Sequence, residues 1–369
     1  MAHQQILLPW VKSYFYRGEG DVPGTQIACY RLSELVSKGV IAAGDGRALL
    51  LSAGLGDLVF QVLWADNSAT SDDELVDHIS DVNGYIIFMH GWTGNHAIWE
   101  SIPGLVVTMS KQRLVAISVD HNGFGDSPFV ETPSLDNCNP PADMRVIEGL
   151  IDVLKIRRQP GEANLKVINF VGHSMGGAAL FYLNPINWRV GEATRLALAP
   201  ALLLDDEVKK IFYTALGIGI GLVNRIHVFE IIERAIKPQV LDALTVGASA
   251  NVRQIHANQY AHTSRGTTAT TFMAMGLLNN REIPRQWDTF RVTLGHRDPL
   301  VGLLPMMDML SKLEFPASNT RVVAGSHYFF SIGPEVVFQH AQNRELVVQD
   351  ILDLHERAYQ LQKTGYRVG

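Results

Sequence analysis

The chain has 369 residues, of which 47% are hydrophobic and 18% are charged. This composition predicts a globular protein with a substantial core rather than a disordered one. The length suffices for one large α/β domain with an insertion, or for two domains. A net charge of −6 and the lack of a long basic run argue against a nucleic-acid partner.

Several features of the chain bear on its compartment. Cys29 and Cys138 are too few for a disulfide framework, which favours a reducing compartment and leaves a single bridge open. The first residues lack the basic segment and long apolar core of a secretory signal. The most apolar stretch, 211–223, is shorter than the roughly 20 residues of a membrane-spanning helix. We therefore expect a cytoplasmic protein without stable membrane insertion.

The N-terminal part of the chain carries weak patterns. Residues 1–45 show one short helix, expected over 32–40. The short apolar runs at 48–51 and 58–64, with glycines between them, predict a β-hairpin. The polar and acidic stretch 68–81 predicts an excursion on the surface.

The middle of the chain alternates apolar runs with helix-like segments. Such alternation predicts a parallel sheet with right-handed crossovers. It stops near residue 200 and resumes near residue 290, so the helical stretch between is predicted to be an insertion in a sheet domain. The expected strands are 85–89, 114–119, 166–171, 196–198, 290–294 and 320–323. The expected helices are one over 96–101 and beyond, then 143–156, 174–183 and 334–362, the last beginning at Pro334.

One apolar run leads into the sequence Gly172-His173-Ser174-Met175-Gly176, followed by small and helix-forming residues. This pattern predicts a buried strand, a tight turn with a serine at its tip, and a helix. The glycines leave room because they carry no side chain. The turn is expected to strain the serine backbone and to place its hydroxyl at the positive end of the helix. Ser174 is therefore the candidate nucleophile.

A serine hydroxyl is a weak nucleophile unless a base lies within hydrogen-bond reach and an acid orients that base. In a doubly wound sheet these partners lie on loops at the carboxyl ends of later strands. The run 290–294 leads to Asp298, and the run 320–323 leads to His327. The chain order Ser174, Asp298, His327 is the order expected of a serine on such a turn.

The developing oxyanion needs two backbone N–H donors. One is expected from Met175, which follows the nucleophile, and the other from the loop after the strand 85–89. In that loop Gly91 permits the bend that turns the Trp92 amide inward.

Taken together, these segments resemble the α/β-hydrolase superfamily. The resemblance implies an α/β fold with a mostly parallel, doubly wound sheet and a helical cap inserted after the sixth strand. The core would comprise 46–200 and 286–369 and the cap 201–285, while 1–45 form an N-terminal extension of unclear role. The matching motifs are His90-Gly91-Trp92, Asp120-His121-Asn122-Gly123-Phe124-Gly125-Asp126-Ser127, Gly172-His173-Ser174-Met175-Gly176-Gly177, Arg297-Asp298-Pro299 and Gly325-Ser326-His327.

The resemblance also implies the roles of the site residues. Ser174 would be the nucleophile, His327 the base and Asp298 the acid, with the two amides described above forming the oxyanion hole. Asp205 and Asp206 stay open as the acid, because some members of the superfamily place it after the preceding strand. No His-Glu-x-x-His spacing occurs, so a metal site has little support.

Three further features have plain structural interpretations. Asp120, Asp126 and His121 are expected to order the loop after the strand 114–119 rather than to do chemistry. His90 is expected to be a hydrogen-bonded scaffold residue beside the substrate pocket rather than a base. The glycines of Gly217-Ile218-Gly219-Ile220-Gly221 follow no strand, so they indicate close helix packing in the cap rather than a dinucleotide loop.

The expected activity is cofactor-free hydrolysis of a hydrophobic carboxylic ester through an acyl-enzyme. A C–C bond hydrolase, a lactonase, a thioesterase or an acyltransferase would use the same triad. A ligand receptor on this scaffold and an interfacial lipase that uses 211–223 are further alternatives, and a homo-oligomer is possible. The expected partner is a small-molecule substrate, and the candidate pocket residues are His90, Gly91, His173, Phe212, Leu216, Phe272 and Met273.

Overall fold

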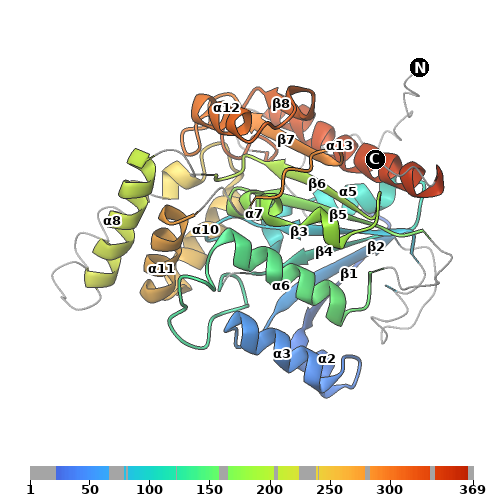
Figure 1. Ribbon diagram of the computed structural model, residues 1–369, viewed down its shortest axis with the longest axis horizontal. Helices are drawn as coiled ribbons and strands as arrows, with labels where there is room; N and C mark the ends of the chain where they lie inside the picture. The colour runs from blue at the N-terminus through green and yellow to red at the C-terminus, as the bar shows by residue number, and fades with distance from the viewer. Residues whose placement is uncertain are drawn as a thin grey trace.

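The structure is a computed structural model of the chain, shown in Figure 1. The residues it describes are 22–65, 79, 82–121, 123–157, 165–202, 207–223, 238–239, 241–278, 283–332 and 337–364. The expected surface excursion at 68–81, the alternative acids Asp205 and Asp206, and the expected helix start at Pro334 lie wholly or largely outside these residues.

An eight-stranded sheet forms the centre of the molecule, with the order β1-β2-β4-β3-β5-β6-β7-β8. β2 pairs antiparallel with both β1 and β4, and all the other pairs are parallel. The prediction of a mostly parallel sheet is therefore confirmed. The strands are β1 (Thr25–Arg31), β2 (Val59–Ala65), β3 (Gly84–Met89), β4 (Leu114–Val119), β5 (Val167–His173), β6 (Ala193–Leu198), β7 (Phe290–Gly295) and β8 (Thr320–Val323).

Helices cover both faces of the sheet (Figure 1). α5 (Ile102–Met109) and α13 (Val337–Thr364) pack against one face, and α6 (Pro140–Val153) and α7 (Met175–Ala179) lie on the other. The 3₁₀ helix η1 (His96–Trp99) precedes α5, so the expected helix at 96–101 is divided in two. The remaining helical segments are α2 (Leu32–Ser37), α3 (Ala43–Ala53), η2 (Leu180–Tyr182), η3 (Pro185–Asn187), α12 (Leu303–Lys312) and η5 (Ala317–Asn319).

The predicted hairpin of residues 48–51 and 58–64 is wrong in its first half. Residues 48–51 lie within α3, and β2 pairs instead with β1, at the edge of the sheet. Alanine and leucine are strong helix formers, and α3 buries Leu49 and Ala53, which are four residues apart, while Leu51 is 80% exposed. Gly54, with φ 70°, ends the helix in the left-handed conformation.

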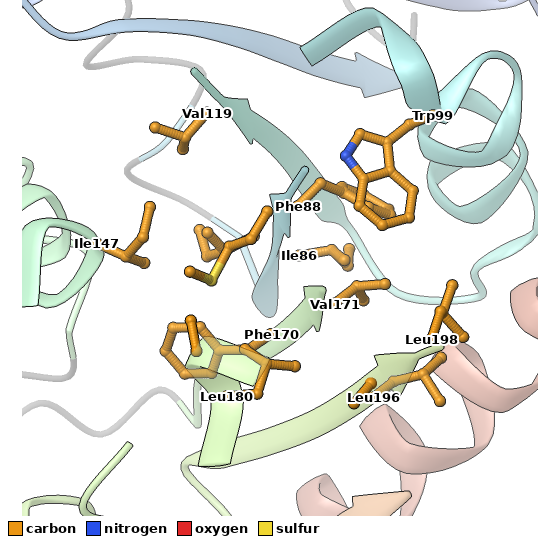
Figure 2. Packing of buried hydrophobic residues seen from close by; sticks show 14 of the residues in the cluster. Ile86, Phe88, Trp99, Val119, Ile147, Phe170, Val171, Leu180, Leu196 and Leu198 are labelled. Carbon is orange, nitrogen blue, oxygen red and sulfur yellow. The ribbon is translucent and has the colours of Figure 1, made fainter. Parts of the chain in front are cut away.

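The apolar core lies on both sides of the central strands (Figure 2). Every residue of β3, β4 and β5 is buried, as expected of parallel strands covered on both faces. On one side Phe88 packs against Trp99, with ring centroids 5.0 Å apart, and on the other Phe170 lies near Leu180. This packing fixes the carboxyl ends of the strands, where the candidate site residues are attached.

The helices whose bounds the structure describes between β6 and β7 gather beyond one end of the sheet (Figure 1). They are α8 (Glu207–Val223), α10 (Ala250–His262) and α11 (Arg265–Gly276). α8 packs closely on α11. At Gly217 the two helices are so near that a Cβ would lie 2.6 Å from the Ala269 carbonyl oxygen and from Met273 Cγ. The close helix packing expected from the glycine motif thus occurs at Gly217, whereas Gly219 faces open space.

Both cysteines are free thiols, Cys29 exposed and Cys138 buried, so the single bridge left open by the sequence does not form. In the described part of the chain, no helix is both long enough and apolar enough to span a bilayer.

Candidate active site

Ser174 lies between β5 and α7 in a strained backbone conformation, with φ 53° and ψ −114°. The two flanking glycines make this turn possible. A Cβ at Gly172 would lie 2.3 Å from the Gly176 carbonyl oxygen, and a Cβ at Gly176 would lie 2.3 Å from the carbonyl oxygen of Met89 on β3. The turn is therefore packed against the neighbouring strand, and no larger residue fits at either position.

His327 and Asp298 come from the loops after β8 and β7 and meet through a hydrogen bond of 2.7 Å between His327 Nδ1 and Asp298 Oδ2. The other carboxylate oxygen, Oδ1, accepts hydrogen bonds from the backbone amides of Leu300 at 2.9 Å and Val301 at 3.1 Å. Burial alone would raise the pKa of Asp298. The charge of His327 and these hydrogen bonds outweigh burial, so the pKa lies below its ordinary value and the carboxylate stays ionised.

Ser174 and His327 line the same cavity, which has a volume of about 200 Å³. The cavity lies between the carboxyl ends of the strands and the helices α8 and α11. Its described lining is mostly apolar and contains no acidic side chain and no lysine or arginine. The lining residues are Trp92, Ser174, Met175, Ala201, Tyr213, Leu216, Ala243, Leu244, Thr271, Phe272, Met275, Leu300, Val301 and His327.

The loop after β3 passes directly against the nucleophile. A Cβ at Gly91 would lie 2.8 Å from Ser174 Cβ, so only glycine allows this approach. The Gly94 amide donates to the Gly91 carbonyl at 3.0 Å and closes a turn in which Thr93 has φ 54°. Trp92 and Met175, the two expected oxyanion donors, both line the cavity with Ser174.

The predicted pocket residues have several different locations. Leu216 and Phe272 line the cavity, and Gly91 lies beside the nucleophile. Met273 packs against Gly217 between α11 and α8, and the side chain of Phe212 lies outside the described part of the chain. The remaining two, His90 and His173, are buried beneath the site and are not among the described lining residues.

His90 holds two loops together below the cavity. Its Nδ1 lies 2.7 Å from the Gly91 carbonyl oxygen, and its Nε2 accepts a hydrogen bond from the His121 amide at 3.1 Å. Burial and the neighbouring His121 ring lower the pKa of His90 to about 3, so the ring is neutral. A neutral ring with both nitrogens engaged is a scaffold residue, as its sequence context predicted.

Asp120 orders the loop after β4. Its carboxylate accepts hydrogen bonds from the His96 amide at 2.6 Å and the Asp126 amide at 2.9 Å, and also contacts His96 Nδ1 at 2.9 Å. The Asp120 side chain thus connects the loops after β3 and β4, which agrees with the structural role expected for it.

His173 packs against the loop that carries His327. Its Nε2 lies 3.2 Å from the His327 carbonyl oxygen, and its ring centroid is 4.6 Å from that of His327 and 4.3 Å from that of Tyr328. Burial and then the charge of His327 lower the pKa of His173 well below its ordinary value, so this ring also remains neutral.

Several residues that the structure brings to the site stand in no recognisable sequence motif. Leu300 and Val301 follow Asp298 directly, and this position in the chain is the one signal that could have pointed to them. Tyr213, Leu244 and Thr271 come from the segment between β6 and β7, and their contact with the cavity depends on packing that no local motif encodes. In the described ranges, no group of three or more His, Cys, Asp or Glu side chains is arranged to hold a metal ion.

Comparisons with known proteins agree with this architecture. Residues 86–340 match the family model described as "Alpha/beta hydrolase family". Similar solved structures include an esterase from Exiguobacterium antarcticum, with 14% identity, TM-score 0.52 and coverage of 74% of this chain and 92% of that one. A bromoperoxidase from Bacillus anthracis has 13% identity and TM-score 0.54, covering 81% of this chain and 96% of that one. No curated protein matches the sequence. The family match covers more than half of the sequence, and the chain belongs to the alpha/beta hydrolase family.

Proposed function

We propose that the chain is a serine hydrolase that cleaves carboxylic esters with a hydrophobic, uncharged acyl or alcohol group. The observation that carries this proposal is the cavity that Ser174 and His327 share, with Asp298 bonded to the far nitrogen of the histidine. Asp298 accepts from Nδ1–H, which leaves Nε2 as the unprotonated nitrogen of a neutral ring.

In the proposed mechanism Ser174 Oγ attacks the ester carbonyl carbon while His327 Nε2 takes the hydroxyl proton. The carbonyl oxygen becomes an oxyanion that the amides of Trp92 and Met175 stabilise. The tetrahedral intermediate expels the alcohol, which receives the proton from His327. Water then gives a proton to His327 and attacks the acyl-enzyme, and collapse of the second intermediate releases the carboxylic acid and restores the Ser174 hydroxyl. Asp298 holds the imidazole and stabilises its protonated form.

The cavity supports a limited range of substrates. A cavity of about 150 Å³ holds a benzene ring, so the volume of about 200 Å³ suits a group of roughly six to eight carbons. The described lining offers no lysine or arginine to a carboxylate, and an unpaired buried charge is costly. These two properties favour medium-length neutral esters over acidic substrates.

Lactones stay a second candidate, because a lactone is an internal ester and meets the same apolar lining. The C–C bond hydrolysis of a vinylogous diketone would use the same triad.

The test is a panel of p-nitrophenyl esters with acyl chains from two to twelve carbons, assayed beside a p-nitrophenyl ester bearing a free carboxylate, a lactone and a ring-fission diketone. The proposal predicts the largest kcat/KM near roughly six to eight carbons, at least tenfold loss for the carboxylate-bearing ester, and no turnover by Ser174→Ala. Turnover of the diketone with no turnover of any ester would overturn it.

A further inference from the structure

A buried histidine of the cap connects the two loops that carry the candidate active site. His256 lies on α10 and is 2% exposed. Its Nδ1 lies 2.8 Å from Thr93 Oγ1, in the loop that presents the Trp92 amide, and its Nε2 lies 2.5 Å from the Tyr328 hydroxyl. Tyr328 directly follows His327 in the chain. One side chain of the cap therefore contacts a neighbour of the oxyanion donor and a neighbour of the base.

A donor and an acceptor can be assigned to each hydrogen bond of His256. The Thr93 hydroxyl donates to the Trp92 carbonyl oxygen at 2.7 Å, so its oxygen accepts the proton on His256 Nδ1. Nε2 of the neutral ring then accepts from the Tyr328 hydroxyl. Burial lowers the pKa of His256 to about 3, which is consistent with a ring that carries a single proton.

The chain of hydrogen bonds ends at Thr93, whose backbone conformation is unfavourable. Thr93 has φ 54°, a left-handed conformation that β-branched residues rarely adopt. Such a conformation persists when its surroundings hold it in place. Thr93 is fully buried, and its hydroxyl is held by His256 on one side and the Trp92 carbonyl on the other. These contacts hold the peptide between Trp92 and Thr93, while the preceding peptide, which carries the Trp92 N–H, is held at the Gly91 carbonyl by the Gly94 amide and His90 Nδ1.

We propose that His256 is a positioning residue through which α10 of the cap holds the oxyanion loop and the His327 loop in register. The inference rests on the proposed function, because it concerns the efficiency of the same serine chemistry. Losing the hydrogen-bond chain frees the peptide that follows Trp92 and so loosens the loop that presents the Trp92 amide. It leaves the substrate pocket intact, since neither His256 nor Thr93 is among the described residues that line the cavity.

The test compares matched variants in the full-length protein. His256→Leu removes both hydrogen bonds, Thr93→Val removes the hydroxyl at nearly constant volume, and Thr93→Ser retains it. His262→Leu, on the exposed end of the same helix, is the control, because His262 bonds to the Asn258 carbonyl of its own helix. Measured quantities are kcat and KM for the best ester, the rate of Ser174 phosphonylation by a fluorophosphonate, and inhibition by an alkyl boronic acid, whose tetrahedral adduct requires the oxyanion hole.

Loss of a whole oxyanion donor costs about two to three orders of magnitude in rate. Because a misoriented donor retains part of its effect, we expect His256→Leu and Thr93→Val to lose about 10- to 100-fold in kcat and in boronic acid affinity, with KM within twofold. The double variant should be no slower than the slower single variant, because both interrupt one chain. Thr93→Ser should recover most of the rate, and His262→Leu should match wild type.

Two negative results have different meanings. If wild-type Ser174 is not phosphonylated and no ester is turned over, the proposed function fails and this inference falls with it. If wild type reacts and Thr93→Val retains full kcat, or if the losses in the double variant multiply, His256 is a packing residue and only this inference is overturned. Should His256→Leu fail to fold, the Thr93→Val and Thr93→Ser pair decides the question alone.

Discussion

At the scale of single residues, the site depends on positions where no other side chain fits. Ser174 has a positive φ, and the turn that holds it requires glycine at 172 and at 176 because a Cβ at either position would lie 2.3 Å from a backbone carbonyl oxygen. Gly91 lies against Ser174 for the same reason. The surrounding packing holds the strained serine in place, which presents its hydroxyl to the cavity before any substrate binds.

Asp298→Asn should abolish most of the activity with little change in fold. The asparagine oxygen can still accept from the amides of Leu300 and Val301, which places its NH₂ group against His327 Nδ1. Two donors would then face each other, so His327 adopts the tautomer with its proton on Nε2 and cannot act as a base. We expect kcat to fall by about four orders of magnitude.

The control for this prediction is Asp308→Asn, which changes an exposed carboxylate that pairs with Lys312. Its activity should equal that of wild type. Near-full activity of Asp298→Asn, with a large loss in Asp205→Asn or Asp206→Asn, would show that the acid follows β6 in the chain instead of β7.

The sequence predicts Ser174, Asp298 and His327 because each follows an apolar strand within a few residues. Local motifs of this kind are visible without a structure. His256 is invisible to the same reasoning, since its partner Thr93 is 163 residues away and the contact exists only once α10 has packed against the loop after β3. Tyr213 enters the cavity for the same reason, by the packing of α8 over the site.

At the scale of secondary structure, the strands β3 to β7 were predictable because a parallel strand buried on both faces is a short, largely apolar run. β1 has no such run, since it lies at the edge of the sheet and its residues are half-buried or exposed. The hydrophobic residues of α3 were therefore mistaken for the strand that pairs with β2. At residues 48–51, packing against the rest of the molecule favours the helix over a strand.

The two glycines Gly217 and Gly219 of α8 should respond in opposite ways to alanine. Alanine is favoured over glycine in a helix by up to about 1 kcal/mol. Gly219 has open space around it, so Gly219→Ala should stabilise the protein by about 0.5–1 kcal/mol. A Cβ at Gly217 would meet the backbone of α11, so Gly217→Ala should destabilise it by about 1–3 kcal/mol. Urea midpoints of the two variants give the comparison, and equal shifts would refute the close packing of α8 on α11.

At the scale of the whole molecule, buried neutral histidines make the fold sensitive to acid. Burial lowers the pKa of His90 and His256 to about 3 and that of His121 and His355 to about 4, from an ordinary value of 6.5. Between pH 6.5 and about 4 the unfolded chain therefore binds protons that the folded protein does not. The free energy of unfolding falls as the pH falls through this window.

His355 allows this effect to be measured away from the candidate site, because it contacts Asn169 and Gln112. Well below pH 6.5 each buried neutral histidine contributes about 1.4 kcal/mol per pH unit to the slope of stability against pH. His355→Gln should lower that slope by about this amount. Asp143, whose pKa is raised by burial, contributes to the slope with the opposite sign. Its contribution is the same in His355→Gln and wild type, so it cancels when the two slopes are subtracted. Urea unfolding at several pH values from 7.5 to 4.5 checks the prediction, and identical slopes would contradict it.

The most direct test of the central claim is to label the intact protein with a fluorophosphonate and map the modified peptide by mass spectrometry. The account predicts one phosphonyl group per chain, attached to Ser174, and no labelling of Ser174→Ala. A label on any other residue, or labelling of Ser174→Ala at the wild-type rate, would contradict a nucleophile at this turn.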